Sequence, residues 1–103
     1  MYQLTALYRH PEDTAAFDQH YRDVHSKLGA ALPRVKRFTM NWTTPGPDGA
    51  APPYYFVATL YWDSEADAQA ALGGPEGEAA IADLPNFAGA GVDIMTGPAE
   101  AVV

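Results

Sequence analysis

The segment Phe17–Leu28 carries ring-bearing and titratable side chains in a pattern that could support proton-transfer chemistry. In a regular α-helix, four of its residues fall in one narrow apolar stripe: Phe17, Tyr21, Val24 and Leu28. His20 and His25 then lie on opposite shoulders of the stripe, where each imidazole reaches the edge of a buried surface. Partial burial lowers the pKa of a histidine and a nearby carboxylate raises it, so both positions can be tuned for proton transfer near neutral pH.

We predict two catalytic residues in a small-molecule site: His25 as acid or base, and Tyr21, its neighbour four residues earlier on the helix, as a hydrogen-bond donor. Four further residues are predicted to bind the substrate: Phe17, His20, Trp42 and Trp62. The alternative interpretation is structural. Histidines at such positions can cap the edge of a core, and bulky aromatic side chains in strands can simply fill it.

Other chemistries find little support in the residue types. The chain has no cysteine, which excludes disulfides, thiolate metal sites and cysteine nucleophiles. His20 and His25 are five residues apart, a spacing that does not stack them on one face of an α-helix, so no metal site is predicted. No glycine-rich loop matches a nucleotide-binding pattern, and the two serines have ordinary helical positions. We therefore expect no cofactor.

The elements that position these residues follow from the hydrophobic pattern of a chain of 103 residues, which we expect to form one domain, 1–103. Strands are predicted at 2–8, 35–42, 54–62 and 92–96. Helices are predicted after the N-cap Asp13, after the N-cap Ser64, and over 76–84. The order β-α-β-β-α-β predicts a ferredoxin-like α+β fold, with a four-stranded antiparallel sheet and the helices on one face.

The sheet face without helices predicts self-association. In the third strand Tyr54, Phe56 and Leu60 share one face, while Val57 and Tyr61 are on the other, so both faces offer apolar area. A large exposed apolar sheet face usually marks association, and we predict a homodimer. The proline- and glycine-rich stretch 43–53 is predicted to be a long exposed loop.

Charge and hydropathy restrict the partners. The net charge is −7, and all six basic residues lie between Arg9 and Arg37, so nucleic acid is not an expected partner. No signal peptide or membrane-spanning segment is recognised, and we expect a cytoplasmic protein without a membrane partner.

Several segments together resemble the EthD family: His10–Asp13, Phe17–His25, Leu32–Pro33, Tyr54–Ala58, Asp63–Ser64, Gly74–Gly77 and Asp83–Ala88. The resemblance covers nearly the whole chain. It implies a dimeric α+β barrel, in which two ferredoxin-like subunits pair their sheets and each keeps a cleft between sheet and helices. It also places the family's histidine at His25 and the preceding tyrosine at Tyr21. The wider superfamily of dimeric α+β barrels, to which this resemblance points, includes cofactor-free oxygenases, cyclases, lactone isomerases and haem-binding enzymes.

Three functions follow as hypotheses. The first is a cofactor-independent enzyme of lyase, cyclase, isomerase or oxygenase type, acting on a small hydrophobic or aromatic molecule with His25 as acid or base. The second is a non-catalytic protein that binds a hydrophobic metabolite, or an accessory protein of a degradation pathway. The third is haem binding through His20 or His25, which a Soret band on haem titration would reveal.

Overall fold

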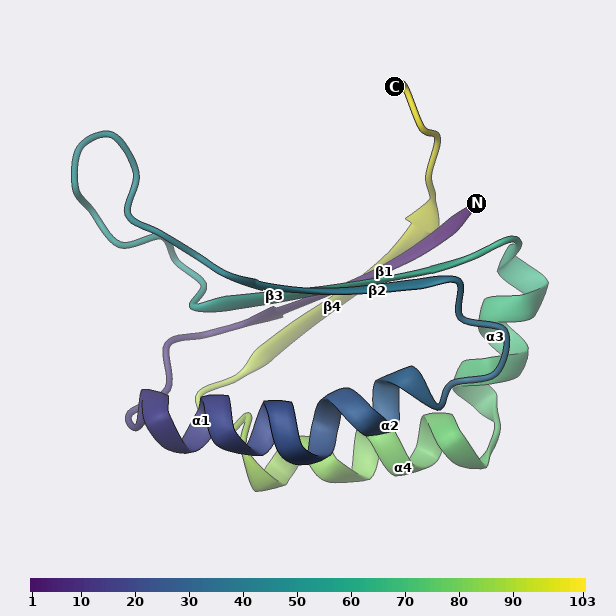
Figure 1. The fold of residues 1–103 in the computed structure, drawn as a ribbon, viewed down its shortest axis with the longest axis horizontal. Coiled ribbons are helices and arrows are strands. Elements are labelled where there is room, and N and C mark those ends of the chain that lie inside the picture. Colours follow the sequence, from purple (N-terminus) through teal and green to yellow (C-terminus); the bar gives the residue numbers. More distant parts are fainter.

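The computed structural model describes residues 1–103 and contains one sheet covered by helices on a single face (Figure 1). The strands are β1 (Tyr2–Tyr8), β2 (Arg37–Trp42), β3 (Phe56–Trp62) and β4 (Val92–Pro98). The helices are α1 (Thr14–His20), the π-helical turn η1 (Tyr21–His25), α2 (Ser26–Ala30), α3 (Glu65–Gly73), α4 (Pro75–Asp83) and the 3₁₀ turn η2 (Leu84–Asn86). The predicted order of strands and helices is confirmed, with strand ends that differ by two residues at most.

The sheet has the order β2-β3-β1-β4, and all three neighbouring pairs are antiparallel. Side chains in β3 alternate as the sequence predicts, with Phe56, Ala58 and Leu60 buried against the helices and Val57 and Thr59 half-buried on the opposite face. The ferredoxin-like α+β fold is therefore confirmed.

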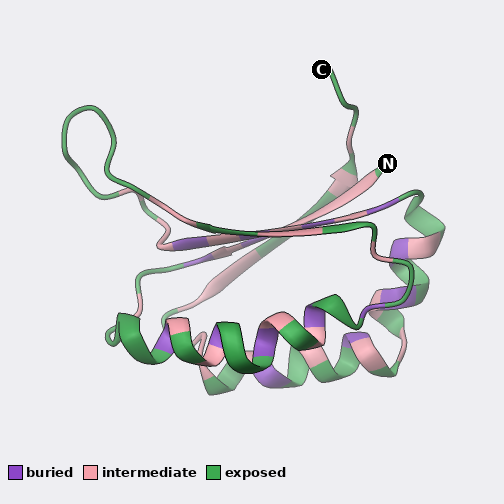
Figure 2. Ribbon diagram, viewed as in Figure 1, coloured by how far each residue is buried: buried purple, intermediate pink, exposed green.

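Side-chain caps fix where the helices begin. The Asp13 carboxylate accepts a hydrogen bond from the backbone N–H of Ala16 at 3.0 Å, and the Ser64 hydroxyl accepts one from the backbone N–H of Asp67 at 3.2 Å. Both predicted N-caps are confirmed. Gly74 separates α3 from α4, which begins at Pro75 and runs beside α2 in the helical layer (Figure 1). Figure 2 shows buried residues interspersed with exposed ones along these helices.

The first helix departs from the prediction because it is not a regular α-helix. Its middle turn, Tyr21–His25, is π-helical, and the N–H of Ser26 bonds back to the carbonyl of Tyr21 five residues earlier. The wider turn shifts the residues that follow it. His25 and Gly29 are buried, whereas Val24 is 41% exposed, so the expected place of Val24 in the apolar stripe is wrong.

A long loop connects β2 to β3. The predicted loop 43–53 lies within the longer segment 43–55, which projects beyond the sheet (Figure 1). The backbone N–H of Thr43 donates to the carbonyl oxygen of Tyr55 at 3.0 Å and joins the two ends of this segment. None of the helices has the length and hydrophobicity required to cross a bilayer. A cytoplasmic location stays a prediction.

Candidate active site

One buried carboxylate, that of Asp83, joins the two histidines singled out by the sequence. The Nε2–H of His20 donates to it at 2.9 Å and the Nδ1–H of His25 at 2.9 Å. The side-chain amide of Asn86 adds a third donor at 3.0 Å. The π turn makes this convergence possible. In a regular α-helix two residues five apart differ by about 140° around the axis, and one carboxylate could not reach both. The inference that these histidines cannot share a face is therefore wrong.

Asp83 is the last residue of α4, where a carboxylate meets the negative end of the helix dipole. Its side chain is only 7% exposed, and hydrogen bonds from His20, His25 and Asn86 stabilise the buried carboxylate in place of water. The sequence prediction missed Asp83 as a site residue. A signal was present, because an acid in the last turn of a helix that is followed directly by Leu84 and Pro85 needs a partner elsewhere in the fold.

The hydrogen bonds define the protonation state of His25. Burial lowers the pKa of His25 and outweighs the opposing effect of Asp83, so the imidazole is neutral near pH 7. Burial raises the pKa of the Asp83 carboxyl, but the bonds from Asn86, His25 and His20 together hold it below its usual range. With Nδ1–H donated to the carboxylate, Nε2 carries the lone pair of the neutral ring. His25 is thus arranged as a base that Asp83 orients.

Two tyrosines lie beside this base. The Tyr21 ring is 5.0 Å from the His25 ring and 5.7 Å from the Tyr8 ring, measured between centroids. Burial raises the pKa of Tyr8 to about 12, and the neighbouring Tyr21 acts to lower it. Burial also raises the pKa of Tyr21, and the neighbouring Tyr8 raises it further. Both phenols are protonated donors at neutral pH, and Tyr8 is a second residue that the sequence prediction missed.

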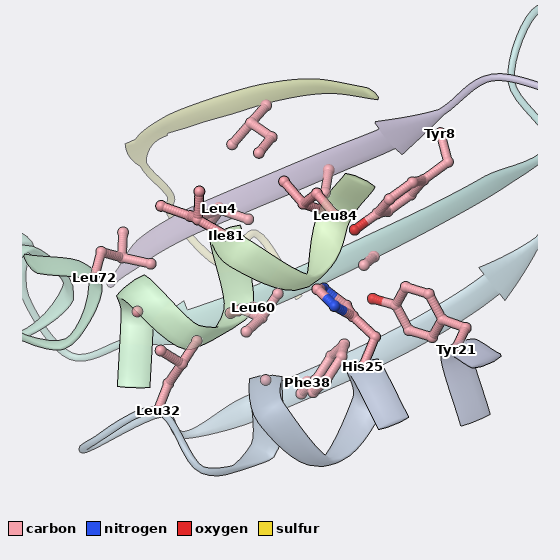
Figure 3. Close-up of a pocket in the computed structure, with 16 residues that line it drawn as sticks. Leu4, Tyr8, Tyr21, His25, Leu32, Phe38, Leu60, Leu72, Ile81 and Leu84 are labelled. Carbon is pink, nitrogen blue, oxygen red and sulfur yellow. The ribbon is translucent and has the colours of Figure 1, made fainter. Parts of the chain in front are cut away.

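A cavity of about 70 Å³ lies between the sheet and the helices, with His25, Tyr8 and Tyr21 in its wall. Figure 3 shows the imidazole and the two phenolic hydroxyls turned toward one another at one end of this space. The remaining wall is mainly aliphatic and contains no lysine or arginine. At the edge of the cavity Ile81 of α4 is 59% exposed and Ile94 of β4 is 48% exposed, and they mark where it opens. The site is an apolar pocket with a base and two donors.

The structure brings two of the six predicted site residues, His25 and Tyr21, to this cavity. His20 bonds to Asp83 and stacks on Phe87, with 5.1 Å between the ring centroids, and its side chain does not line the cavity. Phe17 belongs to the buried aromatic core. The indole N–H of Trp42 donates to Asp18 at 2.8 Å, and that of Trp62 donates to the carbonyl of Pro33 at 3.0 Å. Substrate contacts by these four side chains therefore stay predictions, and none of them lines the cavity as it stands.

The residues do not fit a haem. A space of about 70 Å³ is far below the several hundred Å³ of ordinary ligand pockets, and no cationic side chain lines it to meet propionates. His20 and His25 use ring nitrogens on Asp83, and no group of three histidine, aspartate or glutamate side chains is arranged to hold a metal ion. The residues that line this cavity therefore fit neither a haem nor a metal ion.

Three solved structures share this fold across almost their whole length. A dimeric ferredoxin-like protein of unknown function from Thermobifida fusca is 24% identical, with a TM-score of 0.68 over 93% of this chain and 88% of its own. A mutant of the cofactor-independent oxygenase SnoaB from Streptomyces nogalater is 16% identical, with a TM-score of 0.67 over 99% of this chain and 94% of its own. An EthD family protein from Bacillus halodurans C-125 is 32% identical, with a TM-score of 0.90 over 97% of this chain and 99% of its own.

The sequence comparisons agree with the structural ones. An uncharacterized 11.0 kDa protein in the thcB-thcC intergenic region of Rhodococcus erythropolis is 43% identical over 100% of this chain and 99% of its own. The sequence model of the EthD domain matches residues 9–91, which include His20, His25 and Asp83. The chain therefore belongs to the EthD domain family.

Proposed function

We propose that this protein is a cofactor-independent enzyme that acts on a small, neutral, hydrophobic molecule by general acid–base chemistry. The observation that carries the proposal is the hydrogen bond between His25 and the buried Asp83 at the wall of an apolar cavity. A neutral imidazole held by a carboxylate is a competent base, and the imidazolium formed after proton transfer is stabilised by the same carboxylate. Tyr21 and Tyr8 supply the hydrogen-bond donors.

The charge of the site favours a neutral ligand. Asp83 is ionised, and the cavity wall contains no cation to balance a second carboxylate or a phosphate. Burying an unpaired anion in an apolar pocket is strongly unfavourable. The cofactor-independent oxygenase with the same fold gives additional support for chemistry without a prosthetic group.

Binding of 2-naphthol, a planar molecule with one hydroxyl, tests the site. We expect saturable binding that shifts the imidazole NMR signals of His25, and we expect H25A to weaken it about tenfold, the effect of losing one hydrogen bond to a buried group. The matched control is H10A, because His10 is exposed and lies outside the cavity. Binding that leaves the His25 signals unmoved contradicts the proposed site.

A non-catalytic protein that binds a hydrophobic metabolite is the second candidate, because the same cavity serves both functions. The two differ in the effect of His25 on turnover. For an enzyme, H25A should lower kcat by about 10²–10⁴-fold while the fold is kept, as removal of a general base does. Saturable binding of ligands without any His25-dependent reaction favours the binding protein.

We also infer that the protein is a homodimer. The sheet face without helices contains eight central side chains that are partly or fully exposed in the single chain: Gln3, Thr5, Leu7, Thr39, Val57, Thr59, Tyr61 and Met95. A second copy could cover this face and leave both cavities, which lie on the opposite side of the sheets, open to ligand. The dimeric ferredoxin-like relative supports this arrangement.

A further inference from the structure

We infer that the site takes a neutral, enolisable ketone: Tyr8 donates a hydrogen bond to the carbonyl oxygen while Nε2 of His25 removes a proton from the adjacent carbon. The inference rests on the proposed function and specifies its substrate class. The inference depends on which polar atoms of His25, Tyr8 and Tyr21 have no partner within the protein and can contact a ligand.

The free atom of His25 is Nε2. Its Nδ1 is used by Asp83, and Nε2 has no hydrogen-bond partner within the protein. No fully buried side-chain nitrogen or oxygen is left without a partner, so Nε2 must have access to open space, and the cavity is the space that His25 lines. A lone pair that faces a mainly apolar pocket is suited to accept a proton from the ligand.

The free donor is the hydroxyl of Tyr8. Tyr8 lines the cavity, its hydroxyl has no hydrogen-bond partner within the protein, and Figure 3 shows that hydroxyl turned toward the imidazole of His25. The proton of Tyr8 is then available to the cavity. A phenol O–H aimed at the carbonyl oxygen donates a hydrogen bond that strengthens as this oxygen gains negative charge.

The proton transfer balances within the site. The C–H bond breaks and the proton forms a bond to Nε2, while its electron pair makes the C=C bond of the enolate and the carbonyl pair moves to oxygen. The resulting imidazolium lies between the Asp83 carboxylate and the enolate, so the net charge of the buried site does not change. Return of the proton to the same carbon regenerates the ketone, and its return to a conjugated carbon gives an isomer.

The shape of the cavity places the rest of the ligand. The enclosed volume of about 70 Å³ is smaller than the cavity of about 150 Å³ that binds benzene in another protein, so it holds only the carbonyl end of a larger molecule. The exposed side chains of Ile81 and Ile94 offer an apolar surface where the cavity opens. The ligand is therefore a ketone with an apolar body that extends between α4 and β4.

Deuterium exchange of 2-tetralone in D₂O provides the test, followed by the loss of the proton NMR signals of the carbons next to its carbonyl. We expect wild-type protein to accelerate exchange, H25A to lose about 10²-fold or more, and Y8F to lose about 10²-fold in kcat with little change in KM. Y2F is the matched control for Y8F because Tyr2 does not line the cavity, and it should keep wild-type exchange. Thermal unfolding of each variant verifies that it folds.

The outcomes separate this inference from the proposed function. Exchange that depends on both His25 and Tyr8 supports the inference. Binding of 2-naphthol at His25 without exchange of 2-tetralone, or full exchange in folded Y8F, overturns the ketone inference and leaves the proposed function standing. Absence of both binding and exchange overturns the proposed function as well.

Discussion

At the scale of single residues, Asp83 decides what the two histidines can do. It fixes the tautomer of His25 and engages the Nε2 of His20, so the more exposed histidine cannot present that atom to a ligand. In our proposal His20 is accordingly a positioning residue, because it bonds to the same carboxylate as His25. Phe87 packs on both imidazoles, 5.1 Å from His20 and 4.7 Å from His25 between ring centroids, and restricts their rotation.

Acidification should destabilise the protein in two stages. Because burial lowers the pKa of His25 in the folded state, below about pH 6.5 the unfolded chain binds a proton that the folded protein does not, and stability falls by up to about 1.4 kcal/mol per pH unit. Asp83 has a lowered pKa in the folded state, so its contribution is present above about pH 4 and is lost as the carboxylate protonates.

Urea unfolding between pH 7 and pH 5 measures the first stage. The free energy of unfolding of H25Q should depend less on pH than that of the wild-type protein over this range, and H10Q should keep the wild-type dependence. Equal slopes for H25Q and wild type would show that His25 is not the group that titrates.

The sequence predicts the residue types of this site better than their geometry. His25 and Tyr21 emerge from helical spacing because both lie on the sheet-facing side of one element. Asp83 and Tyr8 come from elements far away in the chain, and only the fold brings them to His25. The π turn is also invisible to helical periodicity, since that pattern assumes 3.6 residues per turn throughout.

At the scale of elements, α4 links the size of the cavity to the position of the base. It supplies Ile81 at the opening and ends at Asp83, so a displacement of this helix changes both. Its close packing depends on Gly77, where an added Cβ would lie 2.1 Å from the carbonyl oxygen of Leu72.

We expect G77A to destabilise the protein by about 1–3 kcal/mol, because the helix must move to relieve the contact. The same shift should alter the NMR signals of His25 through Asp83. The control is G73A, since no atom lies within 4 Å of a Cβ at Gly73, and it should be neutral or slightly stabilising. Thermal unfolding of both variants tests this, and equal stability of G77A and wild type would contradict it.

At the scale of the whole molecule, the two faces of the sheet have separate roles in our proposal. One face forms the floor of the cavity and the other meets a second copy. Sedimentation equilibrium should give twice the 11.1 kDa mass of the chain for the wild-type protein. V57R should yield monomer, because it puts a charge at the centre of the proposed interface. A79R, on the exposed surface of α4, is the control, and a V57R protein that stays dimeric would place the interface elsewhere.

The π turn makes the spacing of the chain itself a component of the site. Five residues form a turn that in an α-helix needs fewer, so the segment Tyr21–His25 is in effect an α-helix with an extra residue accommodated in it. A deletion there would return the helix to regular geometry and rotate one histidine away from Asp83. Every side chain with a proposed role could remain in the sequence, and the shared carboxylate would still lose a partner. For this protein, insertions and deletions in one helical turn are therefore as consequential as substitutions at the histidines.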